Sequence, residues 1–123
     1  MTGANYRRGF DAEKRLLKML KDTGWWCERM YASKGTFDII AVSLSGAILF
    51  IQVKRSKRNV KSTQALINQN REDITRMQLC PARSHASREL WIWIDPQKGS
   101  RTGTWRRLVL YGKGIIEREA TLV

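Results

Sequence analysis

Two runs of apolar, largely β-branched residues dominate the middle of the chain, and only four residues separate them. The runs are FDIIAV at 37–42 and AILFIQVK at 47–54, with SLSG between them. This pattern predicts two antiparallel strands joined by a tight turn. Burying a polar group costs several kcal/mol unless the group is paired or binds something. Three polar residues inside these strands therefore need an explanation, namely Asp38, Gln52 and Lys54.

The register of this hairpin decides whether the three polar side chains meet. If Ser45 is the middle residue of the loop, Asp38 falls opposite Gln52, on the face that also carries Lys54. A two-residue turn at 45–46 instead puts Asp38 and Gln52 on opposite faces. We favour the first register because it gathers the polar residues in one place.

The other predicted elements follow from hydrophobic periodicity and from the turn residues between segments. We expect helices over 10–20 and 62–77, and further strands over 25–31, 90–94 and 105–111. The loop at 95–104 is a long hairpin connection that carries Lys98 and Arg101. The order is helix, three strands, helix and two strands, which predicts a single α/β (α+β) domain over residues 1–123.

The charge balance indicates what kind of partner this domain meets. The chain has 23 Lys and Arg against 11 Asp and Glu, a formal net charge of +12 at pH 7. Its hydrophobic fraction of 42% and five tryptophans supply enough apolar side chain for a modest core, so we do not expect a disordered basic tail. Nucleic acid is the commonest polyanion that a basic folded domain binds, ahead of an anionic membrane surface.

Three further features of the sequence disfavour other classes of protein. The longest apolar run, 47–51, is far too short to span a membrane, and no apolar stretch follows Arg7 and Arg8 as in a signal peptide. The two cysteines, Cys27 and Cys80, form neither a disulfide framework nor a zinc motif. We therefore expect a reduced, cytoplasmic protein without a membrane partner.

A carboxylate lies where the first predicted helix should be apolar. Glu13 is on or beside the stripe formed by Phe10, Leu17 and Leu20. Its simplest explanation is a boundary residue that reaches solvent or pairs with an arginine. The alternative is a functional carboxylate.

The polar residues of the hairpin also have two interpretations. One is an ion pair of Asp38 with Lys54, with the Gln52 amide beside it, although a buried ion pair adds little net stability. The other is a cation site, in which Asp38 and Glu13 supply the hard oxygen ligands that Mg²⁺ prefers and Gln52 supplies a carbonyl oxygen. Lys54 would then stabilise charge that develops on a phosphodiester under attack.

Taken in order, these motifs resemble a known family. A G-x-x-x-E opening at Gly9 to Glu13 precedes SKGTFDII, which contains Ser33 and Asp38, and IQVK closes the set at 51–54. The set resembles the restriction-endonuclease-like nucleases of the PD-(D/E)xK superfamily. More narrowly, it is similar to the archaeal-type Holliday-junction resolvases, which also occur in viruses and phages. The similarity covers residues 6–57 well, and beyond them only the order of elements agrees.

The resemblance implies a restriction-endonuclease-like fold, with a central mixed five-stranded sheet flanked by helices. It implies a homodimer that acts in DNA recombination and repair, binds four-way junctions and makes paired Mg²⁺-dependent nicks. For a viral member the host cytoplasm is the implied location. The implied metal-site residues are Glu13, Asp38 and Gln52; Lys54 is the catalytic lysine, and Ser33 is the serine of the active-site loop.

One residue departs from the family pattern. The resolvases usually carry Glu where this chain has Gln52, so the predicted site has one negative charge fewer. Glutamine occurs there in some related nucleases, such as transposon-end cleaving enzymes. Weaker metal affinity, or a need for Mn²⁺ as a substitute, is the expected consequence.

Basic residues gather around the predicted site. A run of charges is often only a solvated face, but beside an acidic metal site these cations are better explained as phosphate contacts, which are independent of DNA sequence. The chain has no groove-reading helix, so we expect it to recognise DNA shape. The predicted DNA-binding residues are Arg7, Arg8, Lys34, Arg55, Lys57, Arg58 and Lys61.

Three functions thus remain open. The first is a structure-selective, metal-dependent endodeoxyribonuclease that resolves Holliday junctions. The second is a related nuclease for forks, ends or other branched or modified DNA, because substrate choice on one fold depends on loops and dimer geometry. The third is a DNA-binding module whose catalytic site has weakened, with Gln52 as the first sign.

Overall fold

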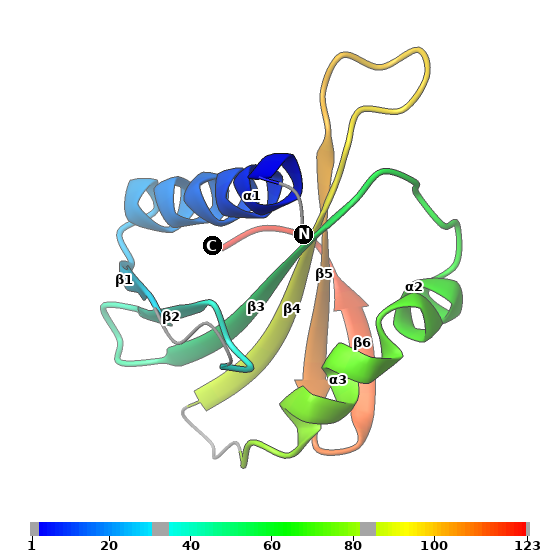
Figure 1. The fold of residues 1–123 in the computed structure, drawn as a ribbon. Coiled ribbons are helices and arrows are strands. Elements are labelled where there is room, and N and C mark those ends of the chain that lie inside the picture. Colours follow the sequence, from blue (N-terminus) through cyan, green and yellow to red (C-terminus); the bar gives the residue numbers. More distant parts are fainter. Residues whose placement is uncertain (1–2, 31–34, 82–85, 123) are drawn as a thin grey trace.

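The computed structural model describes residues 3–30, 35–81 and 86–122, and for residues 3–9 only the helical backbone. It contains one mixed sheet with helices on both faces (Figure 1). The elements in chain order are α1 (Gly3–Asp22), β1 (Trp26–Arg29), β2 (Ile39–Val42), β3 (Ile48–Ser56), α2 (Thr63–Gln69), α3 (Arg71–Gln78), β4 (Ala86–Ile94), β5 (Thr104–Tyr111) and β6 (Gly114–Arg118).

The spatial order of the strands follows their order in the chain. The sheet runs β1-β2-β3-β4-β5-β6, with β3 and β4 as its parallel pair and antiparallel pairing elsewhere. The connection between the two parallel strands carries α2 and α3, as a parallel crossover requires. The predicted mixed α/β architecture is confirmed, with six strands in place of five.

One face of the sheet is covered by α1. Its Leu16 and Leu20 are fully buried and belong to a core with Ile51 of β3 and Trp91 of β4. Because successive residues of a strand point to opposite faces, odd-numbered residues of β3 and β4 face this core. Glu13 in the same helix is therefore held close to the sheet.

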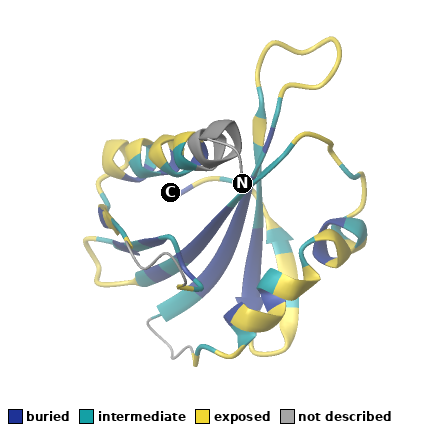
Figure 2. Ribbon diagram, viewed as in Figure 1, coloured by how far each residue is buried: buried dark blue, intermediate teal, exposed yellow. Residues whose placement is uncertain are grey.

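The opposite face is covered by α2 and α3. Leu66 of α2 and Ile74 of α3 are fully buried in a second core with Leu90 and Ile92 of β4. Even-numbered residues of β3 face this side, which includes Gln52. Burial is concentrated in the middle strands, between the two helical layers (Figure 2).

The hairpin register that we favoured is confirmed. Ile39 pairs with Ile51 and Ile40 with Phe50, and the backbone N–H of Asp38 donates to the carbonyl of Ile51 at 2.8 Å. Asp38 directly precedes the first of these pairs, at the point where β2 begins.

Two predictions for the second half of the chain need correction. The helix expected over 62–77 is two helices: α2 ends at Gln69, and the side-chain amide of the next residue, Asn70, donates to the carbonyl of Leu66 at 2.9 Å. A sixth strand, β6, follows a tight turn in which Gly112 has a positive φ of 54°. Among the described residues, no helix is long and apolar enough to cross a membrane.

Candidate functional site

Four of the predicted site residues come from three neighbouring elements. Glu13 lies in α1, Asp38 directly precedes β2, and β3 carries Gln52 and Lys54. The carboxylate of Asp38 accepts a hydrogen bond from the backbone N–H of Val53 at 2.8 Å. Asp38 is therefore fixed to the strand that carries the other two side chains.

Glu13 pairs with an arginine and also faces a second carboxylate. Arg29 Nε donates to its Oε2 at 2.7 Å, and the side chain of Glu13 is 14% exposed. Burial raises the pKa of Glu13, and the nearby charge of Asp38 raises it further, while Arg29 opposes both effects. The arginine pairing considered from the sequence is thus present, but it does not exclude a functional role, because Glu13 and Asp38 share one site.

Asp38 lies near the positive charges of Lys54 and Arg29 and near the carboxylate of Glu13. Burial raises its pKa; the hydrogen bond from Val53 and the charges of Lys54 and Arg29 act in the opposite direction. Two neighbouring carboxylates whose pKa values are both raised repel each other when ionised. A cation between them would relieve that repulsion.

Gln52 and Lys54 share a partner that the sequence did not reveal. Asp73 of α3 accepts a hydrogen bond from Gln52 Nε2 at 3.2 Å and lies 3.1 Å from Lys54 Nζ. Burial alone would raise the pKa of Asp73, but its contacts with Lys54, Arg76 and Gln52 together lower it. The carboxylate within ion-pair distance of Lys54 is thus Asp73, whereas one interpretation of the sequence paired Lys54 with Asp38.

The oxygen atoms available for a cation follow from this arrangement. No three His, Cys, Asp or Glu residues in the described parts of the chain are grouped to hold a metal ion, and the side chain at position 52 is an amide. Gln52 is 7% exposed, and its Oε1 is buried without a hydrogen-bond partner among the described residues. This oxygen and the carboxylates of Glu13 and Asp38 are hard donors of the kind that fit Mg²⁺.

The structure describes only some of the remaining predicted residues, which are the active-site-loop serine and the phosphate contacts. Ser33 and Lys34 lie outside the described residues, and so do the side chains of Arg7 and Arg8. Arg55 forms a two-bond ion pair with Asp95, at 2.8 and 2.6 Å, so its guanidinium is occupied within the protein. The other three, Lys57, Arg58 and Lys61, are exposed.

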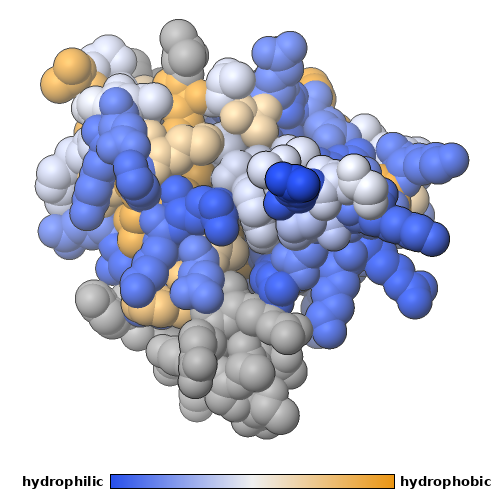
Figure 3. Space-filling view, turned by 90° about the horizontal axis from the view of Figure 1, so that it is seen from above, coloured by the Kyte–Doolittle hydropathy of each residue, from blue (hydrophilic) through white to orange (hydrophobic). Residues whose placement is uncertain are grey.

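A second cationic segment adjoins these three residues. The loop between β4 and β5 is tied to the end of β3, because Asp95 N donates to the carbonyl of Ser56 at 2.9 Å and Gln97 Nε2 to that of Lys57 at 3.0 Å. Lys98 and Arg101 on this loop are exposed. Seen from the end of the molecule to which the loop projects, hydrophilic side chains cover much of the described surface (Figure 3).

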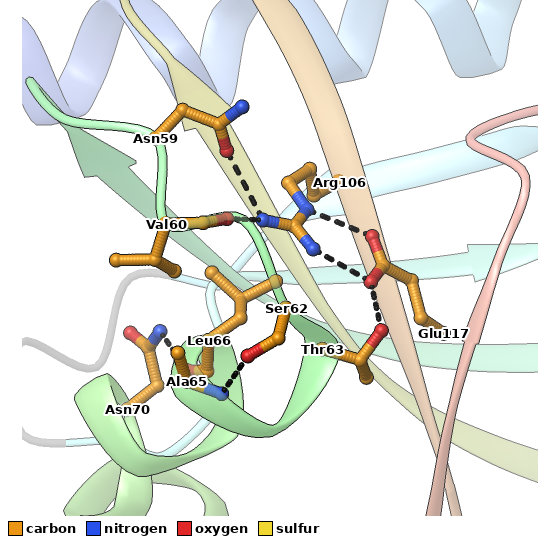
Figure 4. A network of polar contacts seen from close by, with 9 residues as sticks. All are labelled: Asn59, Val60, Ser62, Thr63, Ala65, Leu66, Asn70, Arg106 and Glu117. Atoms are coloured by element: carbon orange, nitrogen blue, oxygen red, sulfur yellow. Dashed lines mark hydrogen bonds and ion pairs between the residues drawn. The ribbon is translucent and has the colours of Figure 1, made fainter.

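The segment between β3 and α2 is held by one arginine (Figure 4). Arg106 of β5 contacts Asn59 and the carbonyl of Val60, and it makes two hydrogen bonds of 2.8 Å to Glu117. Thr63 donates to the same carboxylate at 2.6 Å. The exposed cations of this segment are therefore presented on an anchored backbone.

Comparison with protein families gives a match over most of the chain. Residues 4–96 match the model described as archaeal Holliday junction resolvase (hjc). The matched region includes Glu13, Asp38, Gln52 and Lys54, and it ends directly after β4. None of the curated proteins matches the chain.

Proposed function

The chain belongs to the archaeal Holliday junction resolvase family, and we propose that it acts as a homodimer that cuts four-way DNA junctions by paired, Mg²⁺-dependent nicks. Membership implies a nuclease that acts on branched DNA, and the mixed α/β model is consistent with the restriction-endonuclease-like fold. The metal requirement, the paired nicks and the dimer go beyond family membership and are proposed here.

The observation that supports the metal site is the proximity of the carboxylates of Glu13 and Asp38, the second of which is bonded to the backbone of β3 between Gln52 and Lys54. Glu13 and Asp38 would hold the ion by their carboxylates, and Gln52 by its unpaired Oε1. When bound, Mg²⁺ would polarise the scissile phosphate and lower the pKa of water. Arg29 favours the ionised form of Glu13, which is the form that would bind a cation.

Lys54 is the residue that we propose to act on the phosphate. Its side chain is 39% exposed, so it can reach a bound strand while its charge also acts on Asp38. A fixed cation near the developing negative charge lowers the energy of the transition state. Ser33 remains a predicted active-site residue on the strength of the family resemblance.

The basic segments support binding to the DNA backbone. We propose that Lys57, Arg58 and Lys61 contact phosphates, together with Lys98 and Arg101 of the adjacent loop. Arg7, Arg8 and Lys34 remain proposed phosphate contacts. Arg55 is less suited to bind a phosphate, because its charge is already paired with Asp95. Such contacts depend on salt and not on base sequence.

Two identical sites account for paired nicks. A four-way junction presents two equivalent strands, and a homodimer with twofold symmetry would offer one site to each. Each protomer would then cut one strand.

Two measurements test the metal requirement: the binding of metal to the protein, and the cleavage of a junction with and without metal. Mn²⁺ should bind to the wild-type protein in calorimetry, and Asp38→Asn should weaken that binding. Junction cleavage should need Mg²⁺ or Mn²⁺ and stop in EDTA. Cleavage that persists in EDTA would overturn the metal requirement.

The neutral side chain at residue 52 favours one competing function, a DNA-binding module with a weakened site. That function predicts tight junction binding with no cleavage in either metal. It further predicts that Gln52→Glu creates cleavage where the natural chain has none.

A further inference from the structure

Asp73 of α3 makes contacts that are not required to pack this helix on the sheet. The helix α3 is held on the sheet by Ile74 and Met77, which are both fully buried. The Asp73 side chain is only 13% exposed and points to β3, where it meets Gln52 and Lys54. It contacts two site residues at once, and Arg76 of its own helix is its third partner.

The contact with Gln52 fixes which way that amide points. An ionised carboxylate accepts hydrogen bonds and donates none, so the group of Gln52 that faces Asp73 is the NH₂. The carbonyl oxygen must then point away from Asp73. That oxygen is the buried atom that lacks a partner among the described residues.

This orientation matters because residue 52 is not a carboxylate. Either oxygen of a glutamate could bind a cation, whereas only one end of a glutamine can. If the amide of Gln52 turned over, it would present NH₂ to the cation and remove one of the three oxygen donors. A neutral residue at this position therefore depends on a neighbour that fixes its orientation, as outer partners of metal ligands commonly do.

We propose that Asp73 is a positioning residue, which turns the Gln52 carbonyl toward the cation site and sets the place of the Lys54 ammonium. The inference rests on the proposed metal-dependent function. It predicts that the cost of losing Asp73 depends on which residue occupies position 52.

The chain offers a matched control for the test. Asp73→Asn keeps the size of the side chain but allows the Gln52 amide to turn over, and it removes the charge that faces Lys54. Arg76→Gln removes the third partner of Asp73 and leaves the other two contacts in place. The double variant Gln52→Glu/Asp73→Asn no longer needs an oriented amide.

The experiment measures Mn²⁺ affinity by calorimetry, together with the single-turnover cleavage rate and the junction Kd. We expect Asp73→Asn to weaken Mn²⁺ binding by about tenfold or more and to slow cleavage at saturating junction, with the junction Kd nearly unchanged. Arg76→Gln should leave Mn²⁺ affinity as in the wild type. The double variant should recover Mn²⁺ affinity to at least the wild-type value, which also shows that Asp73→Asn does not act by unfolding the protein.

Two results would overturn the inference, and they differ. Equal Mn²⁺ affinity in Asp73→Asn and Arg76→Gln would mean that Asp73 only packs α3 on the sheet. Absence of Mn²⁺ binding in the wild type itself would overturn the proposed metal site and, with it, the role of Asp73.

Discussion

The carboxylate of Asp38 accepts a hydrogen bond from the backbone N–H of Val53, at 2.8 Å. Val53 lies between Gln52 and Lys54, so this one bond ties three of the four site residues to a single segment of β3. The positions of Asp38, Gln52 and Lys54 are thus set by the pairing of β2 with β3. Variants of these side chains can be designed to change charge and keep that geometry.

The first prediction concerns the two charges nearest the proposed reaction. Asp38→Asn keeps an oxygen that can accept from Val53 but loses the carboxylate, and Lys54→Ala removes the ammonium. Each should reduce cleavage of a four-way junction by about 100-fold or more, measured in single-turnover assays. Junction affinity should stay within a few-fold of wild type, because phosphate contacts supply most of it.

The control for these variants is Asp22→Asn, which changes an exposed carboxylate that pairs with Lys18. This variant should cut as the wild type does. Retained cleavage in Asp38→Asn or Lys54→Ala would show that the site lies elsewhere.

The second prediction concerns the exposed cations that follow β3. If Lys57 contacts a phosphate, Lys57→Ala should reduce the slope of log affinity against log salt by about one. The measurement is junction binding by fluorescence anisotropy over a range of salt concentrations. Lys113, in the turn between β5 and β6, is an exposed cation at the opposite end of β5, so Lys113→Ala should leave the slope unchanged. Equal effects of the two variants would contradict a localised DNA surface.

The third prediction is a dependence of stability on pH. Hydrogen bonds from Arg106 lower the pKa of Glu117, so its ionised form favours the folded state. The stabilisation is complete above the pKa of an unfolded glutamate and is lost as pH falls through the lower pKa of the folded protein. Glu117→Gln should therefore reduce the free energy of unfolding by about 2 kcal/mol at neutral pH and by much less in strong acid.

Urea denaturation at about pH 7 and about pH 3 measures this difference. Glu119→Gln serves as the control, because Glu119 is exposed and lies just beyond β6. If Glu117→Gln cost the same at both pH values, the ion pair with Arg106 would not be the source of its effect.

The fourth prediction concerns the base of the loop between β4 and β5. A Cβ atom on Gly103 would lie 2.4 Å from the ring of Trp93 and 2.5 Å from the carbonyl oxygen of Ile94. Gly103→Ala should therefore destabilise the protein by about 1–3 kcal/mol, seen as a lower Tm. Gly114→Ala is the comparison, since the nearest atom to its Cβ is 3.4 Å away. A Tm for Gly103→Ala equal to that of Gly114→Ala would mean that the strand ends move apart freely.

The central hairpin and most residues of the candidate site could be proposed from the sequence. Two runs of apolar, largely β-branched residues indicated the strands at 37–42 and 47–54, and the polar residues inside them indicated the register. These signals are local, because each residue of the pattern lies within one hairpin. Glu13 was predictable for a similar reason, since a carboxylate on an apolar helix stripe conflicts with its neighbours.

The features that the sequence did not reveal depend on contacts between distant segments. Asp73 is one acidic residue among polar neighbours in α3, and only the packing of that helix on β3 brings it to Gln52. The strand β6 is short and alternately exposed, so its pattern is weak until it pairs with β5. Asn70 divides the predicted helix into α2 and α3, where its side chain donates a hydrogen bond to the carbonyl of Leu66. Helix propensity does not predict this hydrogen bond.

The most direct measurement is the cleavage pattern on a synthetic four-way junction, with each strand labelled in turn and a linear duplex of matching sequence beside it. We predict symmetric nicks in two opposed strands near the branch point in Mg²⁺ or Mn²⁺, and little cutting of the duplex. Failure to nick the junction in any divalent metal, or equal cutting of the linear duplex, would contradict a junction-resolving nuclease.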